Sequence, residues 1–383
     1  MTAQIRFSAL TAAALLTIAA APTTAFAQAA DFTWYGRIDL AAESNNNGAV
    51  SRLAVQNFSS RLGVKGERKF TDSLSGIFQV ETGVAPDDTT QSKTFASRNS
   101  FVGLKSAAAG TLIVGTHDMP LKSLEGTAYA LWGEADLQEM IIHGKGSAST
   151  IGSTFGNVHT RKTNVLLYTS PKLANAVVAK LAFSPDEAKA PADATNPSFN
   201  KQMLGASVEY NDGTFNAGLA TQQQKQFNGA PAVAAVTASP TRLAVNAVAA
   251  VPGTTMKGTK LTFGAKMDAW TAGIAFSKLD NSAGNATKNV IVVGTYALTS
   301  DTTLKASLGK SSESKSGAQD GLRAMAIEAD YALDKQTTAY TYLARVSTDA
   351  KSKATFYAAD NFPATSAAGK DPRALGLGIR YNF

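Results

Sequence analysis

The last eleven residues, 373–383, alternate strictly between large apolar side chains and small or polar ones. The apolar positions are Leu375, Leu377, Ile379, Tyr381 and Phe383. Successive side chains of a strand point to opposite faces, so this stretch predicts a strand with one wholly apolar face. A strand in hydrocarbon needs both edges paired, because each unpaired backbone polar group there costs several kcal/mol. The pattern therefore predicts that the last strand pairs with the first in a closed ring, and it makes Phe383 the candidate terminus for membrane insertion.

The same alternation begins the chain at residues 32–43, where Phe32, Trp34 and Leu40 oppose Arg37 and Asp39. In a soluble sandwich the charged face would meet water, and in a membrane barrel it would line a wet lumen. Composition does not separate the two cases, because a barrel places its apolar residues at alternate positions. The chain is 44% hydrophobic and 17% charged over 383 residues, as an ordinary soluble domain is.

Alternating segments bounded by turn residues recur along the whole chain and predict about sixteen strands. They cover residues 32–43, 61–67, 77–82, 98–104, 111–115, 163–170, 176–183, 203–210, 214–221, 260–267, 270–279, 289–298, 303–309, 324–333, 337–345 and 373–383. Tight polar turns are expected at Asn211, Ser300 and Asp334. The predicted fold is all-β: a 16-stranded antiparallel transmembrane β-barrel with short turns at one end and long outer loops at the other.

Four connections are much longer than the rest: residues 84–96, 117–160, 222–256 and 347–372. Strand parity puts all four on the same side of the barrel. Residues 229–253 are rich in Ala and Val, and a membrane helix is one interpretation of them. The breaks at Pro231, Pro240, Arg242 and Pro252 favour a packed outer loop instead.

The N-terminus has the features of an export signal, with Arg6, an apolar stretch at 7–21 and a small-residue site ending at Ala27. The alternative, a membrane anchor, is disfavoured because the apolar core is short for spanning. We expect residues 1–27 to be removed and residues 28–383 to form the barrel.

The remaining net charge is +6, because Arg6 is the only charged residue lost. Export from the cytoplasm argues against nucleic acid as the binding partner of this positive charge. Anionic lipid and anionic solutes remain as candidates. With no cysteine, stability must come from the backbone ladder and packing.

Several short sequence motifs resemble motifs of one known family. They are Ser-Ser-Arg-Leu-Gly-Val-Lys-Gly at 59–66, Phe-Gln-Val-Glu at 78–81, Ser-Arg-Asn-Ser-Phe-Val-Gly-Leu at 97–104, Tyr-Thr-Ser-Pro at 168–171 and Gly-Ile-Arg-Tyr-Asn-Phe at 378–383. In this order they resemble the general porins of Gram-negative outer membranes, of the β-proteobacterial and neisserial type. The resemblance implies a homotrimer of sixteen-stranded barrels in the outer membrane, whose third outer loop folds inward to narrow a pore for ions and small hydrophilic solutes.

One sequence motif differs from the pattern that is usual in this family. Where such porins usually carry Gly-Arg-Gln or Gly-Arg-Leu at the end of the fifth strand, this chain has Gly115-Thr116-His117. A basic residue common near the constriction is therefore missing. The resemblance does not fix the charge preference of the pore.

The candidate constriction loop is the long connection at residues 117–159. It contains an acidic set, Glu125, Glu134, Asp136 and Glu139, and residues 135–142 could form a short helix. The alternative is an ordinary solvated outer loop. An inward loop with this set would bring negative charge to the narrowest point of the lumen.

Opposite this loop, inward parity predicts a wall of bases on the early strands: Arg37, Arg61, Lys65, Arg98 and, just after the loop, Arg161. Separated acids and bases would set a transverse field that biases ion passage. The alternative is that these bases pair with lumen carboxylates such as Asp39, Glu67 or Glu81. Later bases predicted to face the lumen are Lys260, Lys266, Lys305, Arg345 and Arg380. This excess of bases predicts a mild preference for anions.

Other functions have little support. The three histidines, His117, His143 and His159, lie in or beside the long loop but lack metal-site spacing, so no metal or cofactor is expected. The chain has no Gly-x-Ser-x-Gly elbow, which argues against a hydrolase. Two alternatives to a general diffusion channel stay open: a solute-selective channel and a non-conducting structural or adhesive barrel.

Overall fold

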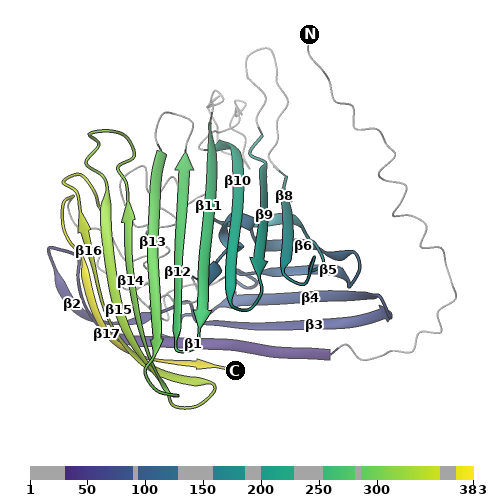
Figure 1. The fold of residues 1–383 in the computed structure, drawn as a ribbon, viewed down its shortest axis with the longest axis horizontal. Coiled ribbons are helices and arrows are strands. Elements are labelled where there is room, and N and C mark those ends of the chain that lie inside the picture. The colour runs from purple at the N-terminus through teal and green to yellow at the C-terminus, as the bar shows by residue number, and fades with distance from the viewer. Residues whose placement is uncertain are drawn as a thin grey trace, which may run out of the picture.

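The computed structural model describes residues 31–88, 94–127, 158–185, 200–227, 253–280, 286–353 and 368–383. These residues form one antiparallel sheet and one short helix (Figure 1). The elements are β1 (Asp31–Asn46), β2 (Ser51–Asn57), β3 (Arg61–Thr71), β4 (Leu74–Gly83), β5 (Ser100–Ser106), β6 (Gly110–Asp118), α1 (Pro120–Ser123), β7 (Arg161–Thr169), β8 (Val177–Ser184), β9 (Met203–Asn211), β10 (Phe215–Phe227), β11 (Thr254–Met267), β12 (Trp270–Asp280), β13 (Ala286–Ala297), β14 (Thr302–Ser311), β15 (Leu322–Ala332), β16 (Thr337–Thr348) and β17 (Arg373–Asn382).

The sheet closes on itself through its first and last strands. β1 pairs with β17 from Arg37 opposite Asn382 to Asn46 opposite Arg373. At the chain terminus the Gly36 amide donates to the Phe383 carbonyl at 2.9 Å, and the Phe383 amide donates back to Gly36 at 3.2 Å. The other edge of β1 pairs with β2 and β3. The predicted pairing of last strand with first is confirmed, and the barrel has no open edge along this seam.

The seventeen strand segments make sixteen strands, because β2 and β3 are two parts of one strand. Both run antiparallel to β1, and residues 58–60 interrupt them. At this break the Phe58 amide donates to the Asp39 carbonyl at 2.9 Å, while the Asp39 amide donates to Ser60 Oγ at 2.9 Å. The sequence prediction for this strand, 61–67, found only its second part. The predicted sixteen-stranded all-β barrel is confirmed.

The barrel is apolar outside and polar inside. On β17 the outward Leu375, Leu377 and Ile379 are 55%, 67% and 52% exposed, while the inward Ala374 and Gly376 are buried. Aromatic pairs gather near the turn end of the outer face, including Trp270 with Tyr296 and Tyr381 with Phe383. Rows of this kind mark the boundary between hydrocarbon and headgroups in transmembrane barrels. The predicted apolar outer face is confirmed.

Short turns join the strands at one end of the barrel. At residues 212–214 the Asp212 carboxylate accepts the amides of Thr214 and Phe215 at 2.9 and 2.7 Å, and Gly213 has a φ of 98°. At the turn after β15 the Asp334 carboxylate accepts the amides of Gln336 and Thr337, both at 2.7 Å. Carboxylate-capped turns of this type fix the register of the hairpins.

The strand ends that the long connections join lie at the other end of the barrel. These connections include the four predicted ones and a fifth between β8 and β9, which the sequence prediction did not single out. The predicted packed loop at 229–253 falls almost wholly outside the described residues, as do residues 1–27 with the predicted export signal. No helix in the described ranges is long and apolar enough to cross a membrane.

A charge placed at the middle of the outer face tests the orientation of the wall. Leu377→Arg should lower the free energy of unfolding in lipid vesicles by about 2–4 kcal/mol, because an arginine at the bilayer midplane loses its hydration. Ser44→Arg, outward near the loop end of β1, should cost about 0–1 kcal/mol. Denaturant titration of the refolded barrel in vesicles measures both, and equal costs would contradict the assigned orientation.

Candidate functional site

The connection after β6 turns into the barrel. Met119 and α1 follow the strand directly, and α1 lies against β8, β9, β10 and β11. Leu121, Leu124 and, at the returning end, Val158 form a buried cluster with Ala220, Met256 and Leu279. These last three side chains point inward from β10, β11 and β12. Both described ends of the connection therefore lie inside the barrel, which confirms the predicted inward folding for these ends.

Four glycines on the inner wall make room for the entering segment; we call Gly205, Gly218, Gly258 and Gly264 the glycine seat. A β-carbon on Gly218 would overlap the Leu124 side chain, and one on Gly258 would overlap Leu121. At Gly264 the overlap would be with Thr127, and at Gly205 Pro120 Cδ lies 3.0 Å from the β-carbon position. Sequence reasoning missed this seat. The sequence signal that could have found it is that all four glycines occupy inward-facing positions on three adjacent strands.

Two side-chain amide groups of β10, those of Gln222 and Asn216, hold the same segment by hydrogen bonds. The Gln222 side chain accepts from the Leu121 amide at 3.2 Å and donates to the Val158 carbonyl, so it joins both ends of the connection. The Asn216 side chain accepts from the Thr127 amide at 3.2 Å and donates to the Thr127 hydroxyl. On the neighbouring strand Lys260 Nζ lies 3.0 Å from His159 Nε2, and both side chains are fully buried. The predicted lumen base Lys260 thus belongs to the loop-docking side.

The opposite wall carries the predicted arginines. Arg37 on β1 and Arg61 on β3 lie directly opposite each other, both facing inward, with Arg98 just before β5. In the ring of sixteen strands, β10 lies eight strands from β1. The loop-docking wall and these arginines therefore face each other across the lumen. We call Arg37, Arg61, Arg98 and Arg380 the arginine wall.

Carboxylates lie between these guanidinium groups. Arg37 pairs with Asp39, and Arg98 pairs with Glu81, which also accepts the Tyr35 hydroxyl at 3.0 Å. Arg380 lies 3.2 Å from Asp330 and 4.0 Å from Asp39. Arg61 donates to the Ser59 carbonyl at 3.4 Å and has no carboxylate within 4.0 Å among the described residues. The alternative interpretation, pairing within the wall, is correct for Arg37 and Arg98 and wrong for Arg61.

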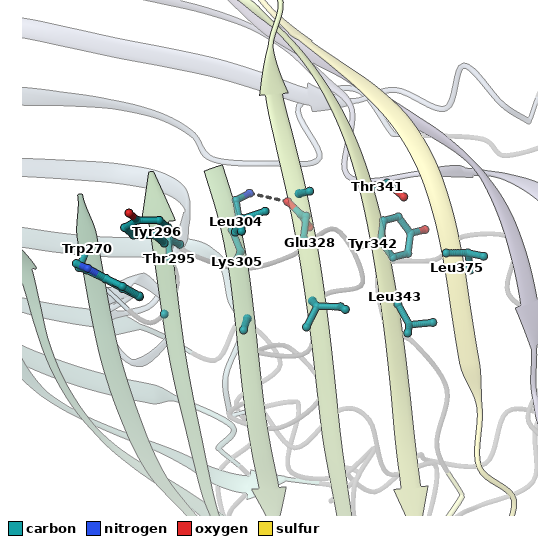
Figure 2. Close-up of a pocket in the computed structure, with 14 residues that line it drawn as sticks. Trp270, Thr295, Tyr296, Leu304, Lys305, Glu328, Thr341, Tyr342, Leu343 and Leu375 are labelled. Atoms are coloured by element: carbon teal, nitrogen blue, oxygen red, sulfur yellow. Dashed lines mark hydrogen bonds and ion pairs between the residues drawn. The ribbon is translucent and has the colours of Figure 1, made fainter. Parts of the chain in front are cut away.

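The remaining predicted bases have varied surroundings. Lys65 lies 5.3 Å from the centre of the Tyr35 ring, and Arg161 at the start of β7 pairs with Asp118 at 3.0 Å. Lys305 bridges Glu328 and Asp330 at 2.6 and 2.7 Å, and Figure 2 shows the first of these contacts running from β14 to β15. Lys266 faces inward by register but is exposed near the turn end of β11.

The prediction that Arg345 lines the lumen is wrong. Its side chain is 60% exposed on the outer face of β16, where it lies 3.3 Å from Asp371 and opposite Arg373. Tyr340 and Tyr342 take the inward positions of this strand instead. Their rings lie over Gly378 and Gly376, and their hydroxyls donate to Asp39 and Glu43. Because two large aromatic side chains occupy the water-facing side of β16, its inward and outward positions are the reverse of those that the sequence suggests.

The predicted acids are placed only in part. Glu125 follows α1 and borders a hollow of about 360 Å³ together with Glu209 and Asn216. The other three, Glu134, Asp136 and Glu139, lie outside the described residues, and so do His143 and the predicted helix at 135–142. Within the described ranges, no group of three or more His, Asp or Glu side chains is placed to hold a metal ion.

The glycine seat gives a direct test of how the segment is held. Gly218→Val should lower the free energy of unfolding by about 1–3 kcal/mol, because the new side chain overpacks against Leu124. The displaced segment has only the lumen to move into, so single-channel conductance should fall as well. Gly294→Val is the matched control, since the nearest atom to its β-carbon position is 3.9 Å away. Unchanged conductance in Gly218→Val would contradict this role for the seat.

Known proteins match this chain at three levels. The Gram-negative porin family matches residues 9–351. The major outer membrane protein P.IB of Neisseria gonorrhoeae is 31% identical over 124 residues, 30% of this chain and 34% of that protein. The P.IB protein of Neisseria sicca is 36% identical over 101 residues, 24% of this chain and 26% of that protein. The chain thus aligns with about a third or less of the length of these relatives.

Solved structures match over nearly the whole chain. The anion-selective porin from Comamonas acidovorans has a TM-score of 0.70 at 18% identity, covering 93% of this chain and all of that one. OmpF of Salmonella typhi has a TM-score of 0.62 at 16% identity, covering 92% of this chain and 97% of that one. At such identities the likeness shows the fold. The family match over most of the chain, joined to this closed barrel with its inward connection, shows that the chain belongs to the Gram-negative porin family.

Proposed function

We propose that this protein is a general diffusion channel of the outer membrane, which passes ions and small hydrophilic solutes down their gradients without chemistry. One observation carries the proposal. The described ends of a long connection are docked against one inner wall of a closed barrel, while the arginine wall stands across the lumen from them. A docked segment narrows the bore, and fixed charges opposite it bias which ions pass.

Charge counting favours a mild preference for anions. The arginine wall has four guanidinium groups and three carboxylates in contact with them, Asp39, Glu81 and Asp330. Arg61 contributes most to the surplus because no carboxylate lies within 4.0 Å of it in the described part of the chain. The structural neighbour from Comamonas acidovorans is an anion-selective porin, which agrees with this direction.

Reversal potential in planar bilayers under a potassium chloride gradient tests the proposal. The wild-type channel should show a potential of the anion-selective sign at about 0.1 M salt, and the preference should shrink near 1 M, where the screening length is about 3 Å. Arg61→Gln should move the potential towards cations, whereas Arg61→Lys should keep its sign. Arg68→Gln, a charge removed from the outer face of β3, is the control and should change nothing.

Other results would count against parts of this account. A cation-selective wild-type potential would overturn the charge argument and leave the channel intact. A folded, membrane-inserted protein without conductance would support the alternative of a structural or adhesive barrel. A conductance blocked by one class of solute alone would support the alternative of a solute-selective channel.

We also propose that the protein assembles as a homotrimer. One structural neighbour, OmpT of Vibrio cholerae, is described as a trimer form. In this chain, the start of β1 extends past the end of β17 and presents Phe32 and Trp34, 63% and 67% exposed, on the outer face (Figure 1). Such large exposed aromatic side chains are suited to a subunit contact. Mass measurement of the complex in mild detergent should give three copies, and a single copy would reject the trimer without bearing on conductance.

A further inference from the structure

Six successive strands, β12 to β17, each carry an exposed base on the outer face near the loop end. We call this set the outward basic belt: Lys278, Lys288, Lys310, Arg323, Arg345 and Arg373. The inward charges of the lumen are a separate set, because neighbouring positions of a strand point to opposite faces. The belt therefore faces the surroundings of the barrel and needs a partner there.

The register makes the belt self-repulsive. Lys278 lies directly opposite Lys288, Lys310 opposite Arg323, and Arg345 opposite Arg373. Like charges directly across a pair of strands are destabilising. Acids relieve this only in part: Lys278 lies 3.5 Å from Asp280 and Arg345 lies 3.3 Å from Asp371. The other four bases have no carboxylate within 4.0 Å in the described ranges. An anion from outside the chain would offset the repulsion.

The height of the belt places it at the edge of the hydrocarbon. Along β13 eight residues separate Lys288 from Tyr296, whose ring packs on Trp270 in the aromatic row at the turn end. Eight residues span about 27 Å of strand, or about 20 Å along the barrel axis at the usual tilt. The apolar band of a transmembrane barrel is about 25 Å tall. The belt is therefore level with the headgroups of the leaflet at the loop end.

The outer surface is hollowed at and below the belt. Lys310, Arg323 and Arg345 border a hollow of about 270 Å³ together with Leu308 and Met325. Further towards the turn end, a second hollow of about 710 Å³ is lined mainly by outward residues of β12 to β17, and the inward-facing Thr295, Lys305, Glu328 and Tyr342 also border it. Small side chains at Gly294, Ala306 and Ala329 make room for it, and Figure 2 shows Leu304, Leu343 and Leu375 along its extent. Cations above an apolar hollow match an amphiphile, with its anionic head at the belt and its chain below.

We propose that the outward basic belt binds the phosphate-bearing headgroup of a membrane lipid in the leaflet at the loop end. Lys310, Arg323 and Arg345 hold the phosphate, and an acyl chain lies in the apolar hollow beneath them. Free phosphate would use the cations but not the hollow. A protein partner would have to approach through the bilayer along this face.

Binding of bisphosphorylated lipid A to the detergent-purified protein tests the proposal, by native mass spectrometry and by the shift in Tm. Lipid A should remain bound and raise the Tm, and 0.5 M salt should weaken it. The double variant Lys310→Gln with Arg323→Gln should bind about 30-fold more weakly, because each cation near the surface contributes about fivefold. Arg68→Gln removes an outward charge from the turn end and should bind as the wild type does.

Three outcomes would overturn the proposal: lipid A without phosphates binding as tightly, the double variant keeping its affinity within twofold, or Arg68→Gln losing as much. Inorganic phosphate at the same concentration should give no Tm shift, and an equal shift would indicate a free-phosphate site instead of a lipid site.

A further measurement separates ligand binding from a structural role. Without anionic lipid, the double variant should have a Tm equal to or above that of the wild type, because it relieves the repulsion between Lys310 and Arg323. A variant with a lower Tm in lipid-free detergent would show that the two bases stabilise the barrel themselves, which contradicts the proposal. Conductance should not change, since both side chains lie outside the lumen.

Discussion

The hydrogen-bonded seam between β1 and β17 is the contact on which the rest of the structure depends. Ten register pairs and the two bonds between Gly36 and Phe383 close the sheet. In a bilayer an open edge would leave a row of backbone groups without partners, so closure is the condition for insertion. Once the ring is closed, each strand has one face towards lipid and one towards the lumen. The positions of the arginine wall, the docked connection and the outward basic belt follow from that division.

Glycine performs a second structural task on the inner wall. The glycine seat on β9, β10 and β11 lets the connection after β6 lie against the backbone. On β17, Gly376 and Gly378 are covered in the same way by Tyr342 and Tyr340. In both places a missing side chain lets another group lie flat on the wall. The bore is thus shaped by where large groups are kept close to the sheet as much as by where they project.

The charges of the lumen and of the outer face are arranged differently. Inside, the bases alternate with acids, as Arg37 does with Asp39 and Lys305 with Glu328 and Asp330. Buried charges need such partners because their desolvation is costly. Outside, bases face bases across the strands of the belt. Paired charges stabilise the wall. Arg61 within the lumen and four bases of the belt outside have no carboxylate within 4.0 Å in the described ranges, and they are left to act on ions or lipids.

Much of this architecture could be predicted from the sequence, because period-two alternation is local. Residues 373–383 predicted their own apolar face and the need for a partner, and the turns at Asn211 and Asp334 were visible as polar breaks. Local patterns also placed Arg37, Arg61 and Arg380 on the inner wall. Only the tertiary structure decided which bases have partners, since the contact of Arg98 with Glu81 joins residues 17 apart, and that of Arg380 with Asp330 joins residues 50 apart. It also decided that Tyr340 and Tyr342 face inward and Arg345 outward. The physical reason is that the rings of Tyr340 and Tyr342 lie over Gly378 and Gly376 of the neighbouring β17, while their hydroxyls reach Asp39 and Glu43 of β1, which barrel closure brings beside β17.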